Sequence, residues 1–432
     1  MMAFDVVPAI VKVAVVFGIV VFSIRKKLSL GNAFFLGSLL LGLFFGMSMP
    51  SILKTAGGAI FYPKTVALAL IVSLILVLSD SMESTGQMRR LLSSFRGLVR
   101  SIRVNMVVFP ALIGLLPMPG GAVFSAPMVK EIGAWVRLGG EKMSFINYWY
   151  RHIWEYWWPL YPAVLLVTAL ADLNLWIYVA IMWPMTLASV AFGWFSLMGL
   201  GISGEKESDH RMHSFKSFAV ELTPILIVVV FGLSLGILLS LVYPGLSVAK
   251  EAGLVVALVV AIGWVWVTND LDWVRIRRIL TDRHLIDMVY MVASILVFKG
   301  MLEGSHAVKS ISADLHSAHL PLLLIVTVLP LIVGLVAGIS IAFVGSTFPI
   351  IIPLVYSFGE GIHLYAYMML AVVSGFMGVL LSPLHLCLLL TNQYFETTIR
   401  EAYRYLWLPC LSVFIFSLLY FSILKRIGQW AF

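Results

Sequence analysis

The sequence has few charged residues and almost no cysteine. Of its 432 residues, 12% are charged and 61% are hydrophobic, and the mean hydropathy is +1.01. A soluble globular domain carries about 25% charged residues, so this composition excludes a soluble globule. The two cysteines, Cys387 and Cys410, both lie in apolar runs. They give no basis for a disulfide framework or a metal cluster.

Signals for several other classes of protein are also missing. No G-x-x-x-x-G-K-[ST] motif occurs, so nothing indicates nucleotide binding. The apolar run from Val6 to Phe22 lacks a basic start and a small-residue cleavage site, and we expect it to remain as a first helix. In a membrane protein the net charge of +8 is first a sign of topology. We therefore expect no nucleic-acid partner, and no cofactor beyond a coupling Na⁺ or H⁺.

The apolar segments predict an all-α polytopic membrane protein. A transmembrane helix needs about 20 apolar residues. Two apolar runs, 104–136 and 320–356, are too long for one crossing and carry Gly, Ser and Pro in their middles, so we expect re-entrant hairpins there. Ten further windows each predict one span: 5–24, 30–47, 64–83, 152–171, 175–199, 217–243, 252–268, 285–303, 362–396 and 405–424.

The basic residues predict the orientation. With the N-terminus outside, 21 of the 29 Lys and Arg residues fall in cytoplasmic loops and seven fall outside. Cytoplasmic loops carry such an excess. We therefore expect a multi-pass protein of the cytoplasmic membrane with both termini outside.

The second half of the sequence repeats the first. Three segments of the first half match three of the second in the same order, at separations of 219, 222 and 224 residues. The pairs are Leu76–Gly86 with Ile295–Ser305, Phe124–Pro127 with Ser346–Pro349, and Trp158–Leu166 with Ser382–Leu390. Five spans per half make the repeat inverted. The predicted units are 1–200, a cytoplasmic linker 201–216, and 217–432.

This organisation resembles a known group of carriers. Three spans, a hairpin, a Pro-broken span and a last span, given twice, resemble the ion-transporter superfamily, which includes dicarboxylate, citrate, gluconate, lactate and arsenite permeases. The segments PMPGGAVFSAP and AFVGSTFP are most similar to an uncharacterised prokaryotic branch of it. Dicarboxylate carriers place Ser-Asn-Thr at each tip, whereas Ser346-Thr347 lacks the Asn and the first tip offers Ser125. The resemblance implies a small anionic substrate and a homodimer, and leaves the choice between sodium and protons open.

The hairpin tips are the first candidate binding site. A helix that begins at mid-membrane presents free N–H groups and the positive end of its dipole, which favour an anion. Glycines let a ligand approach the backbone, and hydroxyls add hydrogen bonds. The alternative is that small residues only let helices pack closely. The candidates for substrate binding are Gly120, Gly121, Ser125, Gly345, Ser346 and Thr347.

The broken spans give a second set of candidates. Pro159 and Pro383 free carbonyl groups that can hold a coupling cation, although a Pro kink can also be purely structural. Tyr161 and His385 occupy equivalent positions two residues later and are candidates for substrate binding. His385 and Asp80 are ionisable groups in apolar surroundings, where such groups are functional by default. Both are candidates for ion coupling, and His385 slightly favours protons.

The run from His152 to Trp158 has two interpretations. His152 and Glu155 share a helix face at a spacing used by metal ligands and acid–base pairs. The neighbouring Trp and Tyr residues favour an aromatic belt at the membrane interface. We adopt the second interpretation.

Three functions remain compatible with the sequence. A secondary active transporter, moving a small carboxylate-type anion by alternating access, explains the hairpins and the inversion. A channel would need a charged ring at a constriction, and the sequence offers none. An intramembrane lipid-modifying enzyme would need His152, Glu155 and His385 to converge. We expect a transporter rather than an enzyme, with a small-molecule substrate and membrane lipid as its partners.

Overall fold

The computed structural model describes residues 7–95, 98–99, 101–118, 120–198, 215–243, 245, 248–317 and 320–431. Every regular element among these residues is a helix. The expected linker 201–216 lies outside the described residues except for its last two positions.

The first half of the chain forms ten helices. They are α1 (Ala9–Arg25), α2 (Leu30–Phe44), α3 (Met49–Ile60), α4 (Pro63–Ser84), α5 (Gln87–Phe95), α6 (Ile102–Ile113), α7 (Ala122–Trp135), α8 (Gly140–Arg151), α9 (Pro162–Leu170) and α10 (Leu175–Met198).

The second half contains eleven α-helices and two short irregular helices. They are α11 (Phe215–Leu226), η1 (Ile227–Phe231), α12 (Gly232–Val242), α13 (Ala249–Thr268), α14 (Trp273–Leu280), α15 (Arg283–Gly304), α16 (Ala307–Ser317), α17 (Leu322–Ala337), α18 (Ser340–Ser357), η2 (Gly361–His363), α19 (Leu364–Leu380), α20 (Leu386–Tyr394) and α21 (Ile399–Ala431).

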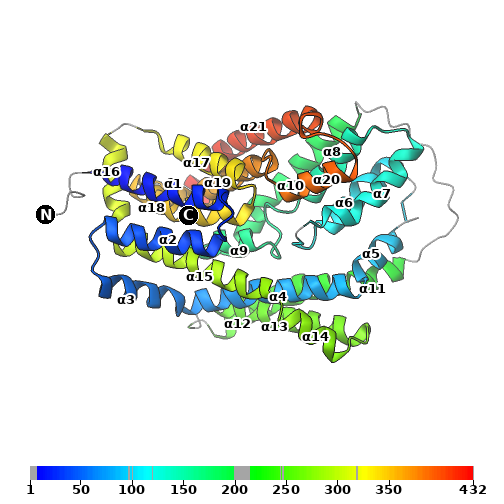
Figure 1. Ribbon diagram of the computed structural model, residues 1–432, viewed down its shortest axis with the longest axis horizontal. Coiled ribbons are helices and arrows are strands. Elements are labelled where there is room, and N and C mark those ends of the chain that lie inside the picture. The colour runs from blue at the N-terminus through cyan, green and yellow to red at the C-terminus, as the bar shows by residue number, and fades with distance from the viewer. Residues whose placement is uncertain are drawn as a thin grey trace.

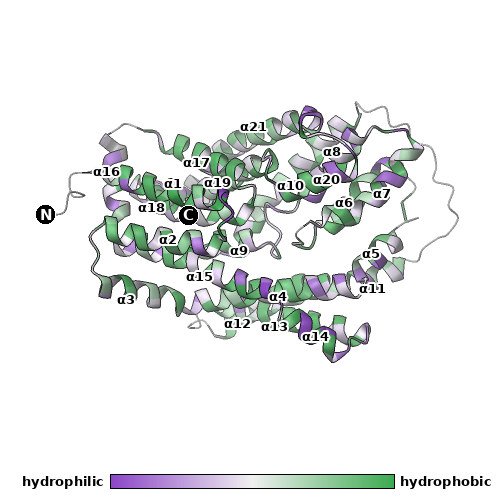
Figure 2. Cartoon of the chain, viewed as in Figure 1, coloured by the Kyte–Doolittle hydropathy of each residue, from purple (hydrophilic) through white to green (hydrophobic). Residues whose placement is uncertain are grey.

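Eight helical stretches of the described chain are long and apolar enough to cross a membrane, and Figure 2 shows their hydrophobic colouring. The chain is therefore a polytopic membrane protein. Two of the expected spans are interrupted: α8 gives way to α9 across residues 152–161, and α19 gives way to α20 across 381–385. The expected spans at 5–24 and 30–47 form the shorter helices α1 and α2, of 17 and 15 residues.

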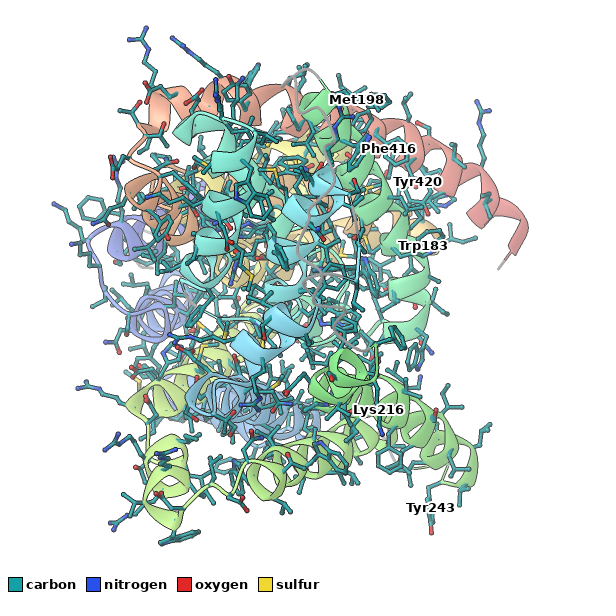
Figure 3. The ribbon with its side chains drawn as sticks, turned by 90° about the vertical axis from the view of Figure 1, so that its right-hand side faces the viewer. Trp183, Met198, Lys216, Tyr243, Phe416 and Tyr420 are labelled. Carbon is teal, nitrogen blue, oxygen red and sulfur yellow. The ribbon has the colours of Figure 1, made fainter. Side chains whose placement is uncertain are left out.

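The helices form two groups. In the first, which we call the hairpin core, α6 packs on α7 and α8, α17 on α18 and α19, α20 on α7 and α8, and α21 on α19 and α10. The outer helices comprise α1–α4 and α11–α15, in which α4 packs on α13 and α15. Figure 1 shows α4 and α12–α14 running along one side of the molecule. Figure 3 separates Phe416 and Tyr420, beside α10, from Lys216 and Tyr243 of the outer helices.

Equivalent helices recur at matching separations. α4 and α15 each have 22 residues, and both of their bounds differ by 220. α9 and α20 each have nine residues, and both of their bounds differ by 224. α6 and α17 begin 220 residues apart, and α10 and α21 begin 224 apart. The separations at which the sequence repeats therefore also relate the helices.

Candidate functional site

The first hairpin turns between α6 and α7. Gly120 adopts the left-handed backbone conformation (φ +71°) just before α7 begins. Gly114 follows α6, and a Cβ there would lie 2.1 Å from the carbonyl oxygen of Arg151. A side chain at Gly114 would therefore force α8 away from the hairpin.

The second hairpin turns at Gly338 and Ile339. Gly338 ends α17 in the left-handed conformation (φ +67°), as is common for a glycine after a helix. A Cβ on Gly338 would lie 2.9 Å from Ser382 Oγ and 3.0 Å from the amide nitrogen of His385. This tip therefore packs directly on the break between α19 and α20.

The expected tip at Gly345–Thr347 is wrong. These three residues lie inside α18. Ser346 Oγ donates to the carbonyl of Ala342 at 2.7 Å, and Thr347 Oγ1 donates to that of Phe343 at 2.8 Å. Helices accommodate Gly, Ser and Thr where neighbours pack closely, and a Cβ on Gly345 would meet Ile295 at 2.7 Å. The structure thus gives Gly345, Ser346 and Thr347 packing contacts within the hairpin core.

The two breaks lie beside the tips. Tyr161 and His385 occupy the residue before α9 and before α20, as their equivalent positions in the sequence suggest. Pro159 lies in the first break and Pro383 in the second. Tyr148 Oη, on α8, donates to the carbonyl of Leu380 at the end of α19 over 3.0 Å. This hydrogen bond joins the two broken spans.

A buried arginine lies where the tips and breaks meet. Arg151, the last residue of α8, is 2% exposed. Its Nη2 donates to the carbonyl of Met118 in the first tip at 2.7 Å, and its Nη1 lies 3.5 Å from Cys387 Sγ. Its Nε has no hydrogen-bond partner, and within the described part of the chain no carboxylate pairs with the guanidinium. A Cβ on Gly121 would lie 2.4 Å from Nη2, so glycine is needed there.

Two histidines and a cysteine adjoin Arg151. The rings of His152 and His385 lie edge to face with centroids 4.9 Å apart. One ligand atom of each histidine and the sulfur of Cys387 lie within 4.8 Å of one another, and all three residues are buried. His152 Nε2 and His385 Nδ1 have no hydrogen-bond partner.

Glu155 connects this group to the second tip. Its Oε2 accepts a hydrogen bond from Ser340 Oγ at 3.0 Å, and its Oε1 lies 3.7 Å from His152 Nε2. Ser340 is the first residue of α18, and no side chain caps that helix. The first break therefore supplies both charges of the site, and both tips reach them. We call Arg151, His152, Glu155, His385 and Cys387 the central cluster.

The aromatic run around His152 lies inside the hairpin core, so its interpretation as an interfacial belt is wrong. Trp154 Nε1 donates to the carbonyl of Ala111 at 2.8 Å, and Trp158 Nε1 donates to that of Leu115 at 2.9 Å. Tyr161 Oη donates to the carbonyl of Gly114 at 2.7 Å. These bonds satisfy carbonyls that lack partners where α6 ends. Tyr161 thus holds the first hairpin in place.

A second polar group lies deeper in the first hairpin. Ser125 Oγ donates to Asn147 Oδ1 at 2.6 Å, and Asn147 Nδ2 donates to the carbonyl of Ala122 at 2.9 Å and to Thr391 Oγ1 at 3.4 Å. Ser144 donates to Asn392. Ser125 therefore connects α7 to α8 and α20.

Asp80 lies apart from the central cluster. It is part-buried near the end of α4, where its electrostatic neighbours are Asp282, Glu83 and His284. Within the described residues it makes no hydrogen bond or ion pair. The structure therefore does not bring Asp80 together with His385.

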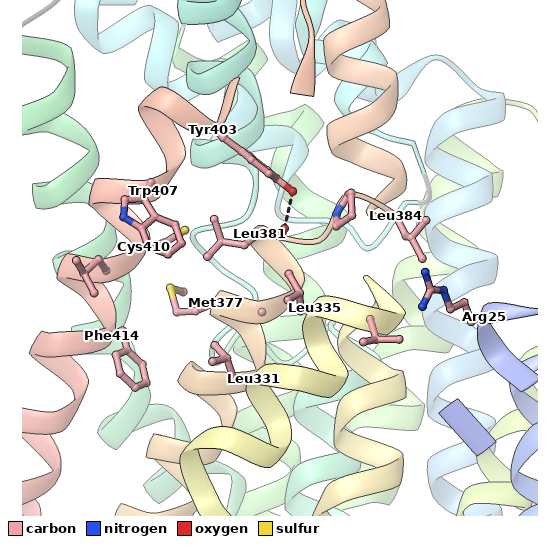
Figure 4. A pocket seen from close by; sticks show the side chains of 14 residues that line it. Arg25, Leu331, Leu335, Met377, Leu381, Leu384, Tyr403, Trp407, Cys410 and Phe414 are labelled. Atoms are coloured by element: carbon pink, nitrogen blue, oxygen red, sulfur yellow. Dashed lines mark hydrogen bonds between the residues drawn. The ribbon is translucent and has the colours of Figure 1, made fainter. Parts of the chain in front are cut away.

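Two hollows flank the core. An apolar groove of about 810 Å³ runs along the second break, with Pro383 and Leu384 in its wall and Arg25 at its edge (Figure 4). A polar hollow of about 960 Å³ lies between α15, α16 and α18, and contains Lys299 and Lys309.

Arg151 and Cys387 are members of the central cluster that the sequence pattern did not single out. The distribution of basic residues places Arg151 in a cytoplasmic loop, and its burial overturns that placement. The available signal was its position directly before the His-x-x-Glu run in a segment rich in aromatic residues.

Comparison with known proteins gives the chain a family. No curated protein sequence matches it. A family model with the description "Protein of unknown function (DUF401)" matches residues 9–424. The chain therefore belongs to the DUF401 family.

Proposed function

We propose that the protein is a secondary active transporter that moves a small, carboxylate-type anion by alternating access, and that the anion binds at Arg151. The observation that carries this proposal is a buried guanidinium with no carboxylate partner among the described residues, at the meeting point of two hairpin tips and two helix breaks.

The surroundings of Arg151 suit an anion. A buried charge is unfavourable unless it is paired, and a carboxylate ligand would supply the partner with up to two parallel hydrogen bonds. α7 and α18 both begin at the tips without a side-chain cap. Their first N–H groups and positive dipole ends add attraction for negative charge.

The matching helix bounds support two inverted repeats. We propose that residues 1–200 and 217–432 each contribute five spans and one re-entrant hairpin, in opposite orientations. The start of α1 and the end of α21 lie toward the same end of the molecule (Figure 1), as an even number of crossings requires. We place both termini outside the cytoplasmic membrane, because the loops then follow the distribution of basic residues.

The contacts between the two helix groups support alternating access. The central cluster is closed: His152 is 1% exposed and His385 is 7% exposed. The hairpin core meets the outer helices through limited contacts of α18 with α15, α9 with α4, and α1 with α17. A shift of the core against these helices would open the cluster first to one side and then to the other. We propose that a proton or sodium gradient drives this cycle.

Counterflow in proteoliposomes tests the proposal. Vesicles containing the purified protein are loaded with one unlabelled mono-, di- or tricarboxylate and then given a trace of the same labelled compound outside. A carrier accumulates the label by exchange, whereas a channel only equilibrates it. We expect accumulation with at least one carboxylate, its loss in Arg151→Gln, and its retention in Arg89→Gln, which removes an exposed charge of α5. No accumulation with any carboxylate, or full accumulation in Arg151→Gln, would contradict the proposal.

The driving ion is tested on the same vesicles. A pH gradient and a sodium gradient are imposed separately, and net uptake of the exchanged carboxylate is measured. We expect uptake above the exchange level with one gradient only. Equal uptake without any gradient would show a facilitator rather than an active carrier.

The convergence of His152, Glu155 and His385 meets the geometric condition for a lipid-modifying enzyme. We therefore treat that function as the second candidate. Incubation of the vesicles with their own lipids, followed by mass spectrometry of the lipid fraction, distinguishes the two. A new lipid product that disappears in Glu155→Gln would favour the enzyme.

A further inference from the structure

We propose that His152, His385 and Cys387 bind a divalent transition-metal ion of the zinc class at the centre of the hairpin core. This site goes beyond the proposed transport function, because metal binding to the purified protein does not require transport.

The three side chains come from two elements and face one point. His152 lies in the first break, whereas His385 and Cys387 lie at the start of α20. Their ligand atoms lie within 4.8 Å of one another. Zinc binds histidine nitrogen at about 2.0–2.1 Å and cysteine sulfur at about 2.3 Å. Small rotations of the side chains would bring all three atoms to these distances.

The hydrogen bonds of His152 favour the form that binds metal. Its Nδ1 lies 2.6 Å from the carbonyl oxygen of Tyr148, so Nδ1 carries the proton and donates it. Nε2 is then left with a free lone pair, and this buried atom has no partner in the protein. Histidines that bind metals usually donate their other ring nitrogen to a carbonyl or carboxylate in this way.

His385 shows a related arrangement. Its Nδ1 is buried without a partner, and the backbone carbonyl of Val379 accepts from its ring. Two unpartnered imidazole nitrogens therefore lie in one closed site. Buried polar groups are nearly always satisfied, and a shared metal ion would satisfy both.

The sulfur and the charges around it determine which metal fits. Cys387 Sγ lies 3.5 Å from Arg151 Nη1, and an adjacent guanidinium stabilises the thiolate that binds metals. Two nitrogens and a thiolate select zinc-class ions over magnesium and calcium, which prefer oxygen. The thiolate and the Glu155 carboxylate also offset the added positive charge.

Three protein ligands leave the fourth position of a tetrahedral ion open. Because Arg151 contacts Cys387, that position lies next to the proposed anion site. If the transport proposal is correct, one carboxylate oxygen could bind the metal while the other pairs with Arg151.

Cobalt provides a direct test. Purified full-length protein in detergent is stripped of metal with a chelator and titrated with Co²⁺. We expect one ion per chain, a thiolate-to-cobalt charge-transfer band and the visible bands of tetrahedral Co²⁺, all of which Zn²⁺ removes by displacement and Mg²⁺ does not. A titration without the charge-transfer band in the wild type would overturn the proposal.

Cysteine variants assign the band. Cys387→Ser should abolish it, whereas Cys410→Ser should keep it, because Cys410 lies on α21 outside the cluster. His385→Gln should weaken binding by at least about 100-fold, the upper end of the loss seen when outer partners of a metal site are removed. A band that survives in Cys387→Ser, or cobalt binding that none of these variants changes, would show adventitious surface binding instead. Gel filtration of each variant confirms that it is folded, and the wild-type spectrum decides the proposal if one is not.

Discussion

The two helix breaks have similar frames but different chemistry. The first break spans ten residues, 152–161, and is flanked by Arg151, whereas the second spans five, 381–385. At a separation of 224 residues, the position of Arg151 corresponds to Gly375 and that of Glu155 corresponds to Val379. The first break supplies charges and aromatic hydrogen bonds. The second follows a helix in close backbone contact with α17.

A repeated frame therefore does not require repeated chemistry. In the second half a Cβ on Gly378 would lie 2.1 Å from the carbonyl oxygen of Leu331, and one on Gly334 would lie 2.0 Å from that of Gly375. In the first half the corresponding space is occupied by a guanidinium and three tryptophans. We therefore expect changes near the second break to affect stability, and changes near the first to affect binding.

The largest effect on stability is expected for Gly378→Ala. The added methyl group meets a backbone carbonyl of α17, so the two helices must separate. Overpacking of this kind lowers the free energy of unfolding by about 1–3 kcal/mol. Thermal unfolding of the purified protein measures the change, and Gly58→Ala is the control because its Cβ meets nothing within 4 Å. An unfolding temperature as high as that of the control would mean that α17 and α19 are not in backbone contact.

Gly121→Ala should separate binding from stability. Its methyl group would lie 2.4 Å from Arg151 Nη2, and the flexible guanidinium can move aside. We expect anion affinity to fall by about tenfold, or about 1.4 kcal/mol, with a smaller loss of folding stability than in Gly378→Ala. Ligand-dependent thermal shifts measure both quantities on one sample. A larger loss of stability than in Gly378→Ala would reverse the proposed division of roles.

Ser340→Ala tests the contact between the first break and the second tip. The change removes the hydroxyl that donates to Glu155 Oε2, and we expect the free energy of unfolding to fall by about 1 kcal/mol. Ser312→Ala, at an exposed position of α16, serves as the comparison. Equal unfolding temperatures for the two variants would argue against this contact.

The smallest effect is expected for Thr347→Val. The Thr347 hydroxyl donates to the carbonyl of Phe343, four residues earlier in its own helix, so its loss leaves no distant group without a partner. Both the free energy of unfolding and the anion affinity should change by less than about 0.5 kcal/mol. A tenfold loss of anion affinity would restore Thr347 to the binding site that the sequence suggested.

Much of the helical arrangement could be predicted from hydropathy alone. The windows at 64–83, 175–199, 252–268 and 285–303 coincide closely with α4, α10, α13 and α15, because long apolar segments have few alternatives to a helix in a membrane. Tyr161 and His385 were also located correctly before α9 and α20, because proline restricts the backbone around it. The count of ten spans stays a prediction.

The central cluster could be predicted only in part. His385 stood out as an ionisable residue in an apolar run. Arg151 did not, because burial of a charge depends on neighbours from α7 and α20 that are distant in sequence. The second tip was misplaced because Gly345, Ser346 and Thr347 have the composition of a turn, while close packing of α18 favours the same small residues. Only the backbone conformation of Gly338 identifies the turn.

The glycine contacts between α17 and α19 also determine which parts can rotate. With no side chains between them, the two backbones interlock and cannot slide past each other without separating. The second tip and the second break must then travel as one rigid body, and the hinge must lie where this body meets α15 and α4. In native-state hydrogen exchange, the amides of α17 and α19 should share one slow opening rate, while those next to the hinge exchange sooner.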